Sequence, residues 1–174
     1  MSANFFQYRT ISDQLMNDMV SRLERAESIV ILAPPNAGQG LVPGKLGEKL
    51  SRDGYGPIIK LNFCLATDRE SAKRTVEEAV RRAECSPSHG ESILSPLDGI
   101  GDTAYLFLAN PEGLPHGLDR IVLQELRALV SERKIVAIVT GEHDLSELVH
   151  GPSSEFNLNY ARKSLRRRLF VGAA

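Results

Sequence analysis

Apolar residues recur along the chain with two different spacings, and the spacing alternates from one segment to the next. Segments in which they return every three or four positions predict helices, because one helical turn takes 3.6 residues. Short, continuous, β-branched runs predict strands covered on both faces. The pattern predicts helices over residues 11–26, 45–52, 71–84, 118–132 and 144–149. It predicts strands over residues 28–33, 57–64, 103–109, 134–140 and 166–171.

The order of these elements indicates the fold class. Strands that alternate with helices are typical of an α/β fold with a mainly parallel sheet. Right-handed crossovers place helices on both faces, so we expect three α/β/α layers. The carboxyl ends of parallel strands meet at one edge, where such sheets bind ligands. The segments after Ala33, Cys64, Ala109 and Thr140 all fall at this edge.

Length and composition narrow the class of protein. The 174 residues suit one domain, with an N-terminal helical segment over 1–27 and an α/β core over 28–174. The net charge of −1 shows no basic excess for nucleic acid or an anionic membrane. Two cysteines, Cys64 and Cys85, fit reduced thiols. With neither a membrane-length apolar run nor a signal-peptide pattern, we expect a cytoplasmic protein without membrane contact.

Two stretches of glycine, proline and polar residues interrupt the pattern. Residues 85–102 form a long connection, of a kind that is often functional or mobile. The other stretch lies between the first strand and the helix predicted over 45–52. A strand, a glycine-rich loop and a helix form an anion site, because main-chain N–H groups converge there and the helix dipole adds positive charge.

The loop after the first strand approaches the phosphate-binding pattern G-x-x-x-x-G-K-[ST], whose Lys contacts phosphates and whose hydroxyl binds Mg²⁺. Aligned on residues 33–40, Gly38 matches the second glycine. Ala33 replaces the first glycine, Gln39 the lysine and Gly40 the hydroxyl residue. The loop therefore departs from the sequence that ATP hydrolysis requires.

A second alignment keeps the Gly44–Lys45 pair but has one residue too many between the glycines, and Leu46 cannot bind metal. It is also farther from the strand, so we favour the first alignment. The predicted ligand-contacting residues are Asn36, Ala37, Gly38, Gln39, Gly40, Leu41, Lys45 and Thr140. Lys45 would fold back toward a phosphate. The alternative interpretation is that the glycines only make a tight turn.

The other parts of an ATPase are also incomplete. An acidic residue at the end of another strand holds Mg²⁺ in such enzymes, and Ala109 or Asn110 stands there. Glu112 and Asp102 flank that strand, where solvated loop acids are the better interpretation. Thr140 ends the fourth strand, either facing a γ-phosphate or capping a turn. The candidate ligands are ATP and ADP, without a convincing set of Mg²⁺ ligands and without a catalytic residue.

Several segments together resemble a known family. They are Tyr8-Arg9, residues 29–40, 50–54, the strand at Leu106, residues 139–141 and Ser153-Ser-Glu-Phe-Asn-Leu158. Their order is similar to the AAA-like ATPase domain of bacterial STAND-type signalling NTPases, which belong to the P-loop NTPase fold. Only Gly38 and Thr140 carry over as site residues, and Gln39 and Gly40 depart from the family pattern.

The resemblance implies a protein that couples ATP binding to oligomerisation or effector release. Because the hydrolytic residues are missing, we expect a catalytically impaired P-loop NTPase-like domain that acts as a regulatory or interaction module in a larger assembly. Its partners would be other protein domains or copies of itself. The alternative is a domain that binds ATP or ADP with slow or no hydrolysis.

Three weaker hypotheses use other residues. A dinucleotide site needs a third glycine after Gly38 and Gly40, which is missing. His143 and Glu147 would share a helix face, but no third metal ligand is spaced with them. A basic cluster could contact nucleic acid, although no aromatic residues alternate with it for base stacking. It consists of Arg162, Lys163, Arg166, Arg167 and Arg168.

Overall fold

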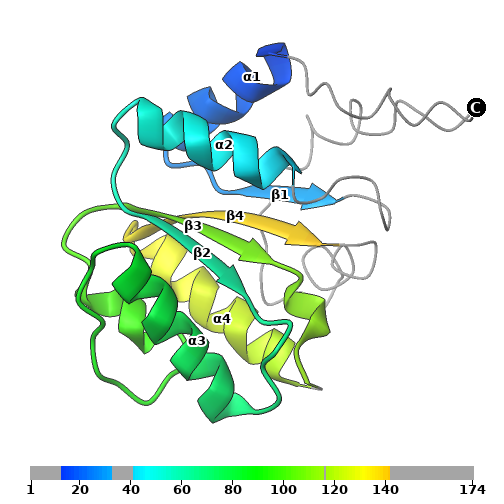
Figure 1. Cartoon of the computed structure of the whole chain (residues 1–174), viewed down its shortest axis with the longest axis vertical. Helices are drawn as coiled ribbons and strands as arrows, with labels where there is room; N and C mark the ends of the chain where they lie inside the picture. Colours follow the sequence, from blue (N-terminus) through cyan, green and yellow to red (C-terminus); the bar gives the residue numbers. More distant parts are fainter. Residues whose placement is uncertain (1–12, 33–40, 116, 142–174) are drawn as a thin grey trace, which may run out of the picture.

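The structure is a computed structural model, and it describes residues 13–32, 41–115 and 117–141. Its centre is a four-stranded, fully parallel sheet with the strand order β1-β4-β3-β2 (Figure 1). The strands are β1 (Ile29–Leu32), β2 (Ile58–Asn62), β3 (Ala104–Ala109) and β4 (Ile135–Gly141). The helices are α1 (Asp13–Glu24), α2 (Leu41–Arg52), α3 (Arg69–Arg82) and α4 (Leu118–Ser131). Two short 3₁₀ helices are η2 (Ser95–Gly99) and η3 (Pro111–Gly113).

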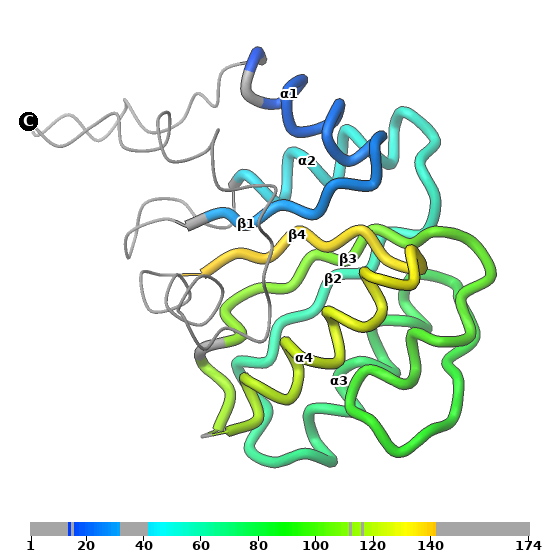
Figure 2. Tube along the Cα trace, turned by 180° about the vertical axis from the view of Figure 1, so that it is seen from behind, coloured from blue at the N-terminus to red at the C-terminus, as the bar shows by residue number. Residues whose placement is uncertain are grey.

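The helices cover the sheet on both sides. Helices α1 and α2 lie on one face, and α3 and α4 lie on the other, as the two opposite views show (Figures 1 and 2). This arrangement confirms the three-layer α/β/α prediction. All four strands of the core that the sequence pattern predicts between residues 28 and 140 are present.

Each face of the sheet has its own hydrophobic core. Successive residues of β3 alternate between them: Tyr105 and Phe107 join the cluster under α1 and α2, and Leu106 and Leu108 join the cluster under α3 and α4. The first cluster includes Leu50 of α2, and the second includes Leu126 of α4. Burying one such side chain stabilises the fold by about 1.5–3 kcal/mol, so the two clusters fix which helix covers which face.

The start of α2 corrects the sequence prediction. The helix was expected from Lys45, but it begins at Leu41, so Val42, Pro43 and Gly44 belong to the helix and not to the loop. Proline is tolerated there because the first turn of a helix does not use its N–H groups for intrahelical bonds. The predicted helix over 144–149 and strand over 166–171 lie outside the described residues, and the single-domain organisation stays a prediction.

The long connection over 85–102 packs into the core. Ile93, Leu94 and Leu97 are almost fully buried in the cluster under α3 and α4. The Glu125 carboxylate of α4 accepts hydrogen bonds from the N–H groups of Ile93 and Leu94, at 3.2 and 2.8 Å. This connection is therefore a structural part of the layer that α3 and α4 form. Within the described part of the chain, no helix is long and apolar enough to cross a membrane.

Candidate functional site

The carboxyl ends of the four parallel strands form one edge of the sheet, which we call the carboxyl edge. The strand register places Asn62 beside Ala109, Ala109 beside Thr140, and Thr140 beside Ile31. These four residues make a row across the sheet, at the last residue of β2 and β3 and one residue before the end of β1 and β4. In parallel sheets this is the edge where ligands bind, and the row defines the floor of the candidate site.

The first turn of α2 lies at the same edge. Residues 33–40 separate the end of β1 from Leu41, and in Figure 1 β1 ends and α2 begins on the right. The first N–H groups of a helix have no intrahelical acceptor, and the helix dipole adds partial positive charge. The first turn of α2 contains no acidic residue. This helix end is therefore electrostatically suited to an anion.

Thr140 brings a buried hydroxyl to this edge. The residue is 4% exposed, and the alternation of β4 turns its side chain to the α1 and α2 side, as for Ile138. Its carbonyl oxygen accepts a hydrogen bond from the Asn110 N–H at 2.8 Å. No residue within 13–32, 41–115 or 117–141 hydrogen-bonds its hydroxyl. Because a buried hydroxyl needs a hydrogen-bond partner, Thr140 is suited to bond a polar group at the carboxyl edge.

Strand β3 ends without a carboxylate. Asn110 follows it in a left-handed conformation, with φ 49° and ψ 53°, which asparagine tolerates better than most residues. The Asn110 carbonyl accepts a hydrogen bond from the Gly113 N–H at 3.0 Å, which closes the turn of η3. In the described part of the sheet, the last residues of β2, β3 and β4 are Asn62, Ala109 and Gly141. None of these three residues carries a carboxylate that could bind Mg²⁺.

The two acids that flank β3 lie at opposite ends of it. Asp102 precedes the strand and is exposed at its amino end, so it cannot serve the carboxyl edge. Glu112 lies in η3, which follows the carboxyl end of β3.

Another acid, Asp68, is used to cap α3. Its carboxylate accepts a hydrogen bond from the Ser71 N–H at 2.7 Å. Hydrogen bonds from the backbone and the side chain of Ser71 lower the pKa of Asp68. Among the described residues, no group of three or more His, Cys, Asp or Glu could hold a metal ion.

The structure describes the predicted contact residues only in part. Asn36 to Gly40 lie outside the described residues, and so do His143 and the basic cluster over 162–168. Leu41 is the first residue of α2, and Lys45 is exposed about one turn later. That Lys45 folds back toward a phosphate stays a prediction.

Asn62 is a residue of this edge that the sequence pattern did not single out. It shares the row with Ala109 and Thr140, and its side-chain oxygen accepts a hydrogen bond from the Cys64 N–H at 3.0 Å. A signal was present, because Asn62 is a polar residue two positions before the end of the strand predicted over 57–64.

Comparisons with known proteins agree with this architecture. No protein-family model matches the sequence, and a search of curated proteins finds no match. The structure is similar to that of Cdc6p from Pyrobaculum aerophilum, an AAA+ P-loop ATPase, with a TM-score of 0.63 and 14% identity. The match covers 91% of this chain and 46% of that chain. At this identity the likeness concerns the fold alone, and the chain has a P-loop NTPase-like α/β/α fold.

Proposed function

We propose that this chain is a P-loop NTPase-like domain that has lost effective hydrolysis and acts as a regulatory or interaction module in a larger assembly. The observation that carries the proposal is the end of β3 at the carboxyl edge. Ala109 and Asn110 stand there, where a P-loop ATPase places the acid that holds Mg²⁺. Gln39 and Gly40 are a second departure, at the positions of the phosphate-binding lysine and the Mg²⁺-binding hydroxyl.

The missing groups explain the expected loss of rate. Phosphoryl transfer depends on cations that neutralise the charge developing on the phosphate oxygens. Removal of a lysine and a metal ligand forfeits several kcal/mol of this stabilisation, and each 1.36 kcal/mol corresponds to a tenfold lower rate. A domain with this fold and without these groups retains its surfaces, and we infer that it works by contact with other protein domains or with its own copies.

A second candidate function is binding of ATP or ADP without rapid hydrolysis. The observation in its favour is the first turn of α2 at the same edge of the sheet as the buried Thr140 (Figure 1). Main-chain N–H groups bind anions whatever the side chains are, so the segment from Asn36 to Leu41 would contact the phosphates. The start of α2 at Leu41 supports the alignment on Gly38, because Gly44 and Lys45 lie inside the helix.

Two measurements test these functions. ATP turnover with Mg²⁺ should be equally close to background in the wild-type chain and in the Gly38→Val variant. Turnover that Gly38→Val abolishes would contradict the loss of hydrolysis. Titration calorimetry with ATP and ADP tests the second function: heat should appear with or without Mg²⁺, and Thr140→Val should weaken binding while keeping the side-chain shape. If no nucleotide produces heat, nucleotide binding is wrong and the interaction role alone remains.

A further inference from the structure

The outer side of β2 is an open edge in the described sheet. The Tyr105 N–H donates a hydrogen bond to the Pro57 carbonyl at 2.8 Å, and Ile58 is the register partner of Tyr105. In a parallel ladder the residues on either side of such a partner bond the neighbouring strand. The main-chain groups of Ile58, Lys60 and Asn62 therefore point away from β3. No main-chain group among the described residues bonds them, which leaves a template for an added strand.

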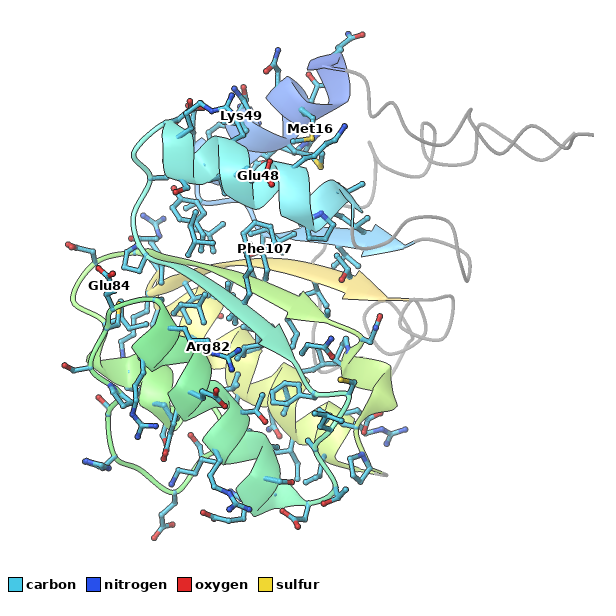
Figure 3. All side chains as sticks on the ribbon, in the orientation of Figure 1. Met16, Glu48, Lys49, Arg82, Glu84 and Phe107 are labelled. Carbon is cyan, nitrogen blue, oxygen red and sulfur yellow. The ribbon has the colours of Figure 1, made fainter. Side chains whose placement is uncertain are left out.

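A groove runs beside this edge, between β2 and α2. This α2–β2 groove has a volume of about 560 Å³ and is lined by Gly47, Glu48, Ser51, Arg52, Ile58 and Lys60. Figure 3 shows Glu48 on the side of α2 turned to the viewer, and Phe107 between α2 and the sheet.

The side chain of Lys60 lies beside Gly47 of α2 in the groove. A Cβ atom on Gly47 would lie 3.4 Å from Lys60 Cε and 3.8 Å from Lys60 Nζ. The lysine stem therefore lies against the helix backbone. A Cβ atom at these distances would make ordinary van der Waals contact with Lys60, so the helix backbone forms one wall of the groove.

The charges of the groove are not paired with each other or with other described residues. Lys60, Arg52 and Glu48 are exposed, and none forms an ion pair within the described ranges. The neighbouring Lys49 differs, because it pairs with Asp53 at 3.3 Å. Two cations and one carboxylate give the groove a net charge of 2 − 1 = +1. This charge is complementary to an acidic ligand.

An exposed leucine lies just past the carboxyl end of the same strand. Leu65 is 86% exposed and is the only large apolar side chain so exposed among the described residues. It sits in the turn closed by the hydrogen bond from the Ala66 N–H to the Phe63 carbonyl, at 2.9 Å. The edge thus ends in an apolar contact point.

We propose that the outer edge of β2 binds an extended acidic segment of a partner protein by strand addition. The inference rests on the proposed function as an interaction module and assigns the surface that it uses. Side chains of an added strand alternate between the two faces, so every second residue would face the groove and place carboxylates near Lys60 and Arg52. An apolar residue at one end of the segment would contact Leu65.

The chemistry of the edge argues against a second copy of this chain as the occupant. A symmetric pairing about the middle of β2 would bring two Lys60 side chains face to face, and like charges in that position are destabilising. A lysine on an edge strand also prevents indiscriminate pairing. That role accounts for Lys60, whereas Arg52 and the exposed Leu65 add selection for an acidic segment with an apolar end.

The test uses the full chain labelled with ¹⁵N and two short synthetic peptides. One alternates Glu with Val and ends in Leu, and the other carries Lys in place of Glu. The acidic peptide should slow hydrogen exchange at the amides of Ile58, Lys60 and Asn62, and should bind at least about tenfold more tightly than the basic one. Lys60→Glu should reverse this preference.

Two further variants sharpen the test. Glu48→Gln removes the one carboxylate of the groove and should strengthen binding of the acidic peptide. Arg120→Glu, the matched control for Lys60→Glu, makes the same charge change at an exposed position of α4 and should leave binding unchanged. Unfolding curves check that each variant folds.

Equal binding of the two peptides, no binding of the acidic peptide, or protection of amides outside β2 would each overturn the inference. So would a dimer in sedimentation that protects the same three amides, because a second copy would then be the occupant. ATP turnover measured on the same samples keeps the two proposals apart. Hydrolysis would contradict the proposed function and leave the peptide result standing, whereas failure of peptide binding without hydrolysis contradicts this inference alone.

Discussion

Glu125 ties the connection before β3 to α4 through both of its carboxylate oxygens. They accept hydrogen bonds from the N–H groups of Ile93 and Leu94 in a partly buried setting. Glu125→Ala leaves these donors without a partner, and we expect it to lower the free energy of unfolding by about 1–3 kcal/mol. Glu125→Gln keeps one acceptor oxygen and should cost less. Urea denaturation measures both, with Gln124→Ala at an exposed position of the same helix as control. A loss no larger than that of the control would show that the contact carries little stability.

Tyr55 joins the end of α2 to α1. Its hydroxyl donates a hydrogen bond to the Glu24 carboxylate, and its ring meets Tyr105 edge-on with centroids 5.8 Å apart. The bond to Glu24, followed by burial, raises the pKa of Tyr55 from 10.0 to about 12. A pKa raised by folding means that the stabilisation is complete below pH 10.0 and is lost as the pH rises toward 12.

We therefore expect the wild-type chain to lose its stability advantage over Tyr55→Phe between pH 10.0 and about 12. Tyr105 and Lys134 also have raised pKa values, the first mainly through burial and the second mainly through a hydrogen bond to Glu132. The quantity to measure is therefore the difference between the two unfolding free energies at each pH. Parallel curves over this range would contradict the role of the Tyr55 hydroxyl.

These residues also show what a sequence can predict about single side chains. Thr140 and Asn110 are predictable at the carboxyl edge, because each follows or ends an apolar strand run. Glu125 and Tyr55 are not, because their partners are 32 and 31 residues away along the chain. A contact of that separation depends on how the helices settle on the sheet, and no local pattern records it.

At the scale of elements, a glycine inside α2, Gly47, allows a test of helix propensity. A Cβ atom there would make ordinary contacts, 3.4 Å from Lys60 Cε and 3.8 Å from Phe107 Cζ. Gly47→Ala should therefore raise the free energy of unfolding by up to about 1 kcal/mol, from helix propensity. Gly44→Ala is the control in the same helix, because its Cβ would meet nothing within 4 Å. If Gly47→Ala destabilises the fold in thermal unfolding and Gly44→Ala does not, the sheet approaches α2 more closely than described.

The elements were predictable where an apolar pattern was long and uninterrupted. The strands and α4 follow their patterns to within a few residues. The start of α2 was missed because Pro43 and Gly44 are typical of loops, although the first turn of a helix accommodates both. The connection over 85–102 was predicted to be of a kind that is often functional or mobile because its composition is polar, yet Ile93 and Leu97 are buried in the core. In the first case helix geometry, and in the second case tertiary packing, outweighed local composition.

For the whole molecule, the alternation of elements predicts a parallel sheet but not the order of its strands. The insertion of β4 between β1 and β3 depends on where each crossover helix packs. It decides which side chains share the carboxyl edge, since it brings Thr140 between Ile31 and Ala109. The same order leaves β2 at the outside, where Lys60 is exposed.

The two cores lie on opposite faces of one sheet, so they should unfold together. Leu50 is fully buried on the α2 side and Leu126 on the α4 side, both at 0% exposure. Either leucine replaced by alanine should lower the free energy of unfolding by about 2–5 kcal/mol. Because β3 contributes side chains to both cores, loss of one removes support from the other. Near-ultraviolet circular dichroism should follow Tyr55 and Tyr105, which pack on the α2 side.

In Leu126→Ala, the tyrosine signal and the far-ultraviolet helix signal should therefore shift to the same lower urea concentration, although the cavity lies across the sheet from both rings. Leu50→Ala should give the same coincidence from the other side, and Arg120→Glu, exposed on α4, should move neither signal. Coincident transitions are the mark of a single cooperative unit. A tyrosine transition that stays at the wild-type midpoint in Leu126→Ala would show that the two layers unfold separately, and that the sheet does not couple the α2 side to α3 and α4.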